Sequence, residues 1–255
     1  MITMKHVKAV FKKQVKDIMK NMGVIVQFVI FPVVAYIMTV LVARSDFFTA
    51  EEVIEGAAAF GVNDTMFVTM FSAIFVGMAL IPVAAGIIAE DKERKSLRFL
   101  VMAGVKPSSY LLGIGGVIFA LSLLPSLAFG LMARFQGAEL WLFMAAMMSG
   151  VIASSLLGLS IGIFSNNQQA ATGLALPAAL ILGFGPMIGI FNESVKKFFS
   201  IFYTQQLDTL INIFTSANGY QEETNLLSAF GIIWANIAVL IAVFIIAYTK
   251  KGLKG

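Results

Sequence analysis

Long apolar runs separated by short clusters of charge dominate this chain. Stretches without Asp, Glu, Lys or Arg extend over residues 21–43, 65–89, 107–133, 140–192 and 224–249. Each is long enough for the roughly 20 residues that a helix needs to cross a bilayer. The run 140–192 is long enough for two helices, and the polar sequence Ser165–Gln169 divides it. The pattern therefore predicts an all-α polytopic protein with six transmembrane helices, at 24–43, 66–89, 109–133, 140–164, 171–191 and 225–248.

Before the first predicted span, residues 1–23 contain lysines and apolar residues at helical spacing. A helix there would carry valines, Phe11 and Ile18 on one face and five lysines, among them Lys12 and Lys16, on the other. A basic amphipathic helix of this kind is typical of a segment that lies in the membrane interface. A positively charged topology anchor with no further role would have the same pattern, so both interpretations stay open.

A densely charged segment, Glu90–Gly113, lies between the second and third predicted spans and reads EDKERKSLRFLVMAGVKPSSYLLG. Its first half would form a charged helix with an apolar edge at Leu97, Leu100 and Val101, which suits a docking surface. Pro107 cannot continue a helix and Gly104 weakens one, so the helix should end there. We expect a short helix that lies roughly parallel to the membrane and contacts another protein.

Residues 193–223, between the fifth and sixth predicted spans, mix phenylalanine and leucine with charged residues. Their longest charge-free stretch, 198–207, is too short to cross a bilayer. We interpret this segment as re-entrant or interfacial helices on the outer side of the membrane.

The fourth predicted span carries a small residue at every fourth position. A stripe without bulky side chains lets another helix approach closely in lipid. That helix could belong to the same chain or to a second copy, and the pattern leaves both open. The stripe consists of Gly150, Ser154, Gly158 and Gly162.

Composition and charge agree with this topology. The chain is 59% hydrophobic and 13% charged, which is typical of an integral membrane protein. With six spans, both termini and the charged segment share one side, which holds 14 of the 18 basic and 4 of the 14 acidic residues. The net charges are then +10 on that side and −6 on the other. By the positive-inside rule both termini are cytoplasmic, and we expect a single membrane domain over residues 1–255.

Groups that could carry out chemistry are scarce. The chain has no cysteine, and its only histidine, His6, lies among lysines, so we expect neither a metal site nor a catalytic residue. The predicted spans contain no charged side chain, which argues against a proton-coupled carrier and against an intramembrane hydrolase. The glycine cluster Gly113–Gly116 lacks the G-x-x-x-x-G-K-[ST] pattern of a phosphate loop. We expect the chain to bind no cofactor, so any ATP must be bound by another polypeptide.

The charged segment resembles the membrane subunits of ABC-2 type ABC transporters. Members of that family commonly read like E-x-E-x-G-[ST]-L-x-x-L-x-x-x-x-V between spans two and three, followed by an apolar stretch ending near G-K. Lys95 stands where glycine is usual, and Ile114 stands where lysine is usual. The matching positions are Glu90 or Asp91 with Glu93, then Ser96, Leu97, Leu100, Val105 and Tyr110–Gly113.

The resemblance implies the permease subunit of an ATP-driven exporter in the plasma membrane of a prokaryote, most similar to the drug, antibiotic and peptide export branch. Its partners would be a cytoplasmic ABC ATPase dimer that binds ATP and Mg, a second permease copy, identical or related, and the lipid membrane, but no nucleic acid. A secondary carrier and a non-transporting membrane scaffold are the alternatives. The charged segment would be a coupling helix in a groove of the ATPase, with Glu90, Asp91, Lys92, Glu93, Arg94, Ser96, Leu97, Leu100 and Val101 at the coupling site.

Overall fold

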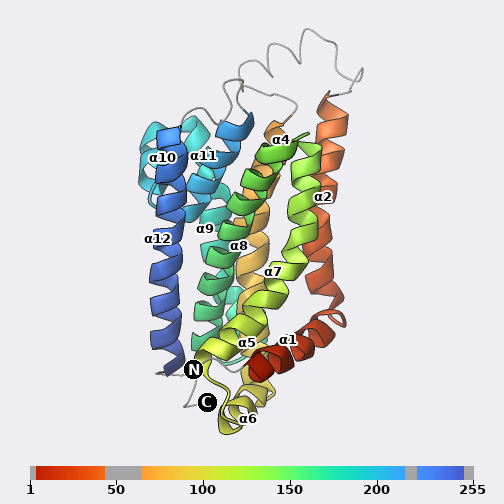
Figure 1. Cartoon of the computed structure of the whole chain (residues 1–255), viewed down its shortest axis with the longest axis vertical. Helices are drawn as coiled ribbons and strands as arrows, with labels where there is room; N and C mark the ends of the chain where they lie inside the picture. Colours follow the sequence, from red (N-terminus) through yellow and green to blue (C-terminus); the bar gives the residue numbers. More distant parts are fainter. Residues whose placement is uncertain (1–3, 44–64, 216–222, 250–255) are drawn as a thin grey trace.

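The computed structural model describes residues 4–43, 65–215 and 223–249, and these are helical with short connections. Six helical spans in this part of the chain are long and apolar enough to cross a membrane, which confirms the predicted all-α architecture. Figure 1 shows them side by side in one bundle. They are α2 (Met22–Ala43), the continuous α4 (Met66–Ile74), η1 (Phe75–Ala79) and α5 (Leu80–Glu93), α7 (Pro107–Met132), α8 (Gly137–Phe164), α9 (Gln168–Phe191) and α12 (Glu223–Ala247).

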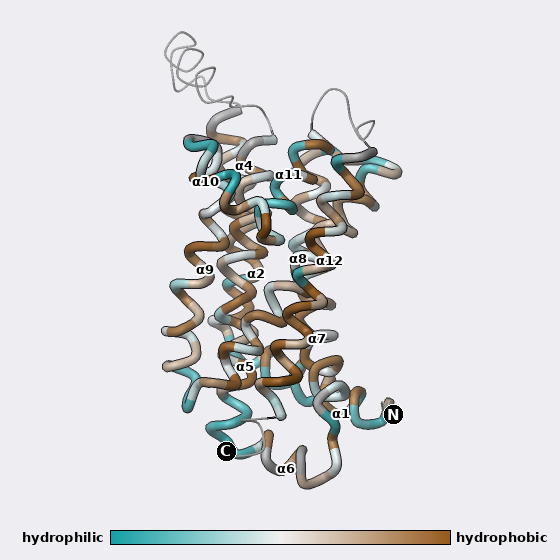
Figure 2. The backbone as a smooth tube through the Cα atoms, turned by 90° about the vertical axis from the view of Figure 1, so that its left-hand side faces the viewer, coloured by the Kyte–Doolittle hydropathy of each residue, from teal (hydrophilic) through white to brown (hydrophobic). Residues whose placement is uncertain are grey.

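Four shorter helices lie at the two ends of the bundle (Figure 1). At one end, which we call the α6 end, are α1 (Met4–Ile18) and α6 (Ser96–Met102), and at the other are α10 (Glu193–Phe199) and α11 (Tyr203–Thr215). Apolar residues fill the middle of the long helices, and polar residues gather toward both ends (Figure 2). The segment 46–64, which is rich in acidic residues, and the lysines Lys250, Lys251 and Lys254 lie outside the described residues.

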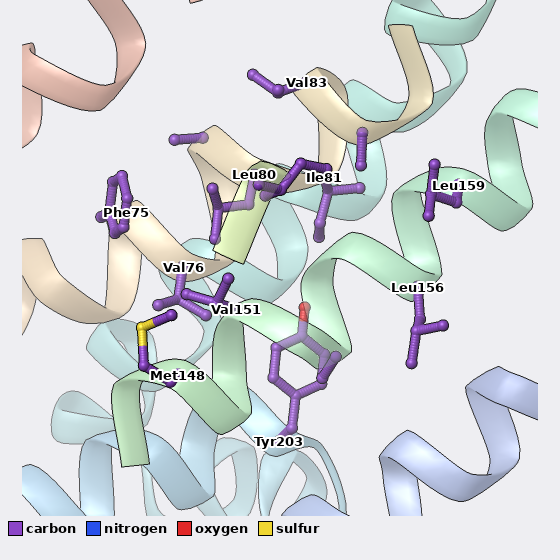
Figure 3. Packing of buried hydrophobic residues seen from close by; sticks show 14 of the residues in the cluster. Phe75, Val76, Leu80, Ile81, Val83, Met148, Val151, Leu156, Leu159 and Tyr203 are labelled. Atoms are coloured by element: carbon purple, nitrogen blue, oxygen red, sulfur yellow. The ribbon is translucent and has the colours of Figure 1, made fainter. Parts of the chain in front are cut away.

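The centre of the bundle is the contact between α5 and α8, where the stripe of small residues lies. A Cβ atom on Gly158 or Gly162 would overlap the α5 backbone carbonyls of Ile81 and Ala85. The two backbones therefore approach too closely for any larger side chain. Figure 3 shows the apolar residues of η1, α5 and α8 around this contact. Gly158 and Gly162 therefore pack against α5 of the same chain.

The second span is interrupted by η1, a turn of π-helix. Beside this turn, Ser154 Oγ donates a hydrogen bond to the carbonyl of Val76 at 2.6 Å, and the Tyr203 hydroxyl lies 2.8 Å from the same serine oxygen. Tyr203 begins α11 and is buried against α8 (Figure 3). The π turn is thus connected through one serine to the helix at the end opposite to α6.

The charged segment after the second span differs in part from its prediction. Glu90–Glu93 form the last turn of α5, so the span continues four residues beyond the predicted end at Ala89. Lys95 then adopts a left-handed conformation with φ 57°, which favours glycine, the usual residue at this position of the family pattern. α6 ends as predicted: Gly104 has φ 77°, and Pro107 is the first residue of α7.

The segment between the fifth and sixth spans forms α10 and α11, neither of which is long enough to cross a membrane. α11 packs against α8, α9 and α12. Tyr203, Leu207 and Ile211 are among its buried residues. Its placement as a re-entrant or interfacial helix stays a prediction.

Candidate functional site

Three consecutive charged residues in the last turn of α5 contact different parts of the chain. They are Asp91, Lys92 and Glu93, and we call them the α5 junction. Successive side chains on a helix point about 100° apart, so neighbouring residues can reach different helices. The α5 junction contacts α1, α6, α7, α8 and α9.

Asp91 is 3% exposed, and its carboxylate is surrounded by hydrogen-bond donors. Two of them belong to α1, one to the start of α6 and one to α7. They are Lys13 Nζ, Gln14 Nε2 at 2.7 Å, Ser96 Oγ at 2.8 Å and the Tyr110 hydroxyl at 2.8 Å. One buried carboxylate thereby joins three helices that are separate in the sequence.

This arrangement offsets the cost of burying a charge. A buried carboxylate is tolerated only when it is paired and hydrogen-bonded, and Asp91 has both kinds of partner. Lys13 also lies 3.1 Å from Asp17 on its own helix. Burial lowers the pKa of Lys13, but the hydrogen bonds and charges of Asp91 and Asp17 outweigh it, so the pKa is raised above its usual value. Lys13 therefore stays protonated at neutral pH.

Lys92 and Glu93 bind the two sides of the turn between α8 and α9. Lys92 Nζ donates to the carbonyls of Ile163 at 2.6 Å and Ser165 at 2.7 Å, at the C-terminal end of α8. Glu93 Oε2 accepts from the backbone N–H of Gln168, the first residue of α9, at 3.0 Å. A cation at a helix C-terminus and an anion at an N-terminus both complement the helix dipole. The α5 junction thus holds the ends of α8 and α9 together.

Glu90 and Arg94 flank the α5 junction and form an ion pair one helical turn apart. The guanidinium Nη2 of Arg94 lies 2.8 Å from Glu90 Oε1, and the Arg94 side chain is 68% exposed. An exposed pair of this kind contributes about 0–1 kcal/mol to stability. Arg94 is therefore accessible to another molecule at little cost.

The exposed surface of α6 differs from the predicted docking edge. Leu97 is buried at 2% exposure and Leu100 is half-buried, so both pack inward, because α6 folds back toward the end of α5. The side chain of Val101 lies outside the described part of the structure. Phe99 and Met102 are instead 64% and 67% exposed. Phe99 and Met102, and not Leu97 and Leu100, are therefore the exposed apolar residues of α6 among those that the structure describes.

α1 lies across the α6 end of the bundle and packs on α7 (Figure 1). Ile18 is buried, Phe11 is 36% exposed, and Lys12 and Lys16 are exposed. Val10 is fully buried and occupies the space left by Gly113 of α7. The basic face predicted for this helix is therefore exposed, while part of its apolar face packs against the protein.

The partners of Asp91 are the functional residues that the sequence interpretation missed. Gln14 was the available signal, because it interrupts the apolar face of α1 between Val10 and Ile18. A polar side chain on an apolar face needs a buried partner. Lys13 and Tyr110 gave no comparable signal, since lysines surround the first and an apolar span contains the second.

Among the described residues, no group of three or more His, Cys, Asp or Glu side chains could hold a metal ion. The chemistry of the α5 junction is that of ion pairs and hydrogen bonds between helices.

Comparison with known protein families gives a match over most of the chain. A family model described as "ABC-2 family transporter protein" matches residues 45–249, which is most of the chain and includes the α5 junction and α6. No curated protein matches the sequence.

Proposed function

The chain belongs to the ABC-2 family of transporter proteins, and we propose that it is the permease subunit of an exporter driven by a separate ATPase. As a member of this family, it is a multi-pass membrane permease. The proposal adds the direction of transport, the ATPase and the way in which ATP hydrolysis moves the permease.

The observation that supports this mechanism is the α5 junction beside an exposed short helix. Ser96, the first residue of α6, donates to Asp91 Oδ1, so a displacement of α6 acts directly on the end of α5. Asp91 would pass this displacement to α1 and α7, and Lys92 and Glu93 would pass it to α8 and α9. A movement of one short helix would thereby shift five others as a unit.

The ATPase would bind at α6. Phe99 and Met102 supply exposed apolar surface, and Arg94, two residues before the start of α6, has an exposed guanidinium. Apolar anchors with a neighbouring arginine are the typical centre of a protein interface. The ATPase would be a dimer that binds ATP and Mg. The permease would also pair with a second permease, identical or related, and each ATPase subunit would bind the α6 helix of one permease.

In this assembly the α6 end faces the cytoplasm of a prokaryotic cell, in agreement with the excess of positive charge on that side. The cargo would be a peptide, an antibiotic or another amphipathic molecule. Closure of the ATPase on ATP would pull the α6 helices and change the access of the transport pathway.

The test is to co-express the chain with the ATPase encoded beside it, purify the complex and measure ATP hydrolysis in lipid nanodiscs. We expect the double variant Phe99→Ser, Met102→Ser to lose the ATPase on purification, because each buried apolar side chain contributes about 1.5–3 kcal/mol. The matched control is Trp141→Ser, which removes a residue that is 75% exposed on α8 and should leave the complex intact.

The role of the α5 junction requires a second variant. Glu93→Gln removes the charge that binds the N-terminus of α9 and leaves the α6 surface unchanged. We expect normal assembly with the ATPase but reduced stimulation of ATP hydrolysis by the permease. Normal stimulation in Glu93→Gln would contradict transmission through α9, and an intact complex in the double variant would contradict docking on α6.

A further inference from the structure

An apolar groove of about 310 Å³ lies between α7 and α12, with α8 as its floor. Figure 1 shows α8 between the other two helices, which both pack against it. α7 and the end of α12 meet near the α6 end, where the ring centroids of Tyr110 and Tyr248 lie 6.0 Å apart. Farther from this end the groove separates them. Its lining includes Leu112, Gly115 and Phe119 of α7, Leu156 of α8 and Ile241 of α12.

The groove suits an alkyl chain. Ser155 is the one polar side chain among its described residues, and its hydroxyl donates to the carbonyl of Val151 at 2.6 Å, so the lining is apolar. A cavity of about 150 Å³ binds benzene, so the volume here has room for about a dozen carbon atoms. The lining extends along α7 from Leu111 to Phe119, which is about 12 Å at 1.5 Å per residue. Leu112 is 49% exposed at the rim, so a chain can enter from the side.

α1 crosses α7 beside this groove. Val10 occupies the space at Gly113, and the ring of Phe11 lies against Gly116, which lines the groove. Gly116 is about one turn farther from the start of α7 than Gly113, so the Phe11 side of α1 faces the middle of the bundle. Met4, two turns before Phe11 on the same side, is 74% exposed. This side of α1 therefore extends the apolar surface of the groove.

Four lysines form a stripe beside the Phe11 side of α1. At about 100° per residue, Lys8 lies next to Phe11 around the helix, and Lys12 follows it. All four side chains are exposed, and within the described part of the chain none of the four forms an ion pair or a hydrogen bond. Their charges are therefore available to an anion outside the protein. The lysine stripe consists of Lys5, Lys8, Lys12 and Lys16.

We propose that the groove and the lysine stripe form one binding site for an anionic phospholipid of the leaflet around the α6 end. One acyl chain lies in the groove, and the phosphate binds Lys8 and Lys12. Lysines at a membrane surface attract acidic headgroups, and the adjoining groove favours a lipid over a soluble anion. The site uses neither the ATPase nor the cargo, so the inference does not rest on the proposed function. Because α1 also binds Asp91 through Gln14, the lipid lies one helix away from the α5 junction.

The test is a lipid titration of the full chain in detergent, without ATPase or ATP, measured by native mass spectrometry. The probes are dioleoylphosphatidylglycerol, which is anionic, and dioleoylphosphatidylcholine, which has no net charge. Because the two lipids share their acyl chains, the difference in affinity reports the headgroup. We expect the first phosphatidylglycerol to bind about tenfold more tightly than the first phosphatidylcholine. Equal affinities would overturn the proposal and indicate ordinary contact with bilayer lipids.

A double variant of α1 tests the headgroup site. Lys8→Gln with Lys12→Gln should lower the affinity for phosphatidylglycerol about tenfold, to that for phosphatidylcholine, and leave phosphatidylcholine binding unchanged. The matched control, Lys196→Gln with Lys197→Gln, removes the same charge from exposed lysines of α10 at the other end of the bundle. This control should bind both lipids like the wild type. Unchanged phosphatidylglycerol affinity in the α1 variant would overturn the proposal.

A second variant, Gly115→Leu, tests the acyl-chain site by filling the groove. No neighbouring side chain or helix lies within 4 Å of a Cβ at Gly115, so the variant should fold. It should weaken the binding of both lipids about tenfold, because the chain loses its apolar surface. The matched control is Gly173→Leu on α9, where the space beside the glycine is equally open, and it should bind like the wild type.

Two results with these probes would contradict the acyl-chain site. Unchanged lipid binding in Gly115→Leu would mean that the chain lies elsewhere. Displacement of phosphatidylglycerol by glycerophosphoglycerol, the same headgroup without acyl chains, would indicate a site for soluble anions. The proposed function fails separately, through loss of ATPase coupling, which these binding measurements do not use.

Discussion

Two aspartates are buried among the described residues, one near each end of the bundle, and they have different surroundings. Asp91 is 3% exposed and accepts hydrogen bonds from side chains on α1, α7 and the start of α6. Asp208, on α11, is 9% exposed. Its carboxylate accepts from Asn212 of the same helix at 3.0 Å. Burial raises the pKa of Asp208 to about 6, although the charge of Lys196 and the hydrogen bond from Asn212 lower it in part.

The difference shows two ways in which a bundle can treat a buried charge. Asp91 has partners from other helices, so its burial joins those helices at the α6 end. Asp208 has its hydrogen-bond partner on its own helix, so its burial opposes the packing of α11. Gln205 and Thr204 beside it also have buried oxygens without a hydrogen-bond partner in the described structure. We expect the α6 end to move as one body and α11 to separate from the bundle more readily.

The largest expected effect comes from Asp91→Asn. Breaking a buried ion pair costs up to about 3–5 kcal/mol, and Lys13 would keep only its partly exposed pair with Asp17. We expect the free energy of unfolding to fall by about that amount, measured by thermal or denaturant unfolding in detergent. Asp17→Asn is the control, since its side chain is 32% exposed and its loss should cost less than about 1 kcal/mol. Equal effects in both variants would remove the distinction between Asp91 and a surface aspartate.

Asp208→Asn should instead raise the free energy of unfolding at neutral pH. The pKa of Asp208 is about 6 in the folded state against a usual value of 3.8, so the folded protein binds the proton more tightly between these pH values. Wild-type stability therefore falls as pH rises through this window and stays lower above it. At pH 7.5 the variant should be more stable by up to about 3 kcal/mol, at 1.36 kcal/mol per pKa unit. The gain should decrease toward pH 4, and scanning fluorimetry across pH 4–8 measures it.

Tyr110→Phe removes one donor from Asp91 and leaves the other three. A hydrogen bond to a charged group contributes about 1.5–3 kcal/mol, and we expect a loss near the lower limit because Lys13 can compensate. Tyr36→Phe, at a residue that is 57% exposed on α2, should change nothing. A loss as large as that of Asp91→Asn would mean that Tyr110 has a role beyond this hydrogen bond.

The smallest effect is expected for Asn212→Ala. Asn212 is exposed, and its Nδ2 atom donates to the Asp208 carboxylate, so its removal should raise the pKa of Asp208 further. The pH above which stability levels off should rise by less than about one unit, because Asn212 is exposed and water can replace part of its hydrogen bond to the carboxylate. A shift in the other direction would show that Asn212 does not stabilise the charged form.

The local features of this fold could be predicted from the sequence, because they depend on neighbouring residues. Charge-free runs give the six spans, and Gly104 and Pro107 end one helix and begin the next. The end of the second span was misplaced at Ala89, since Asp91 and Lys92 look like loop residues. Lys13, Gln14 and Ile163, which bind these two side chains, lie more than 70 residues away in the sequence, and such distant partners leave no local signal.

The exposed apolar surface of α6 could not be predicted for a related reason. A helical pattern shows that Leu97 and Leu100 share an apolar edge, but it does not show which neighbour covers that edge. In the structure the chain itself covers Leu97, and Phe99 and Met102 stay exposed. The π turn η1 also has no signal in the apolar sequence Phe75–Ala79.

That π turn has a consequence for the charges that follow it. A π turn holds one residue more than an α turn, and each helical residue adds about 100° of rotation and 1.5 Å of rise. If residues Phe75–Ala79 were α-helical and the start of the span stayed in place, every later residue would move by one position along the helix. Glu90 would then occupy the position of Asp91, and Asp91 would occupy the position of Lys92 and face the carbonyls of Ile163 and Ser165, so that attraction between α5 and the end of α8 would become repulsion. The single extra residue that η1 absorbs therefore sets the sign of the charge that α5 presents to α8.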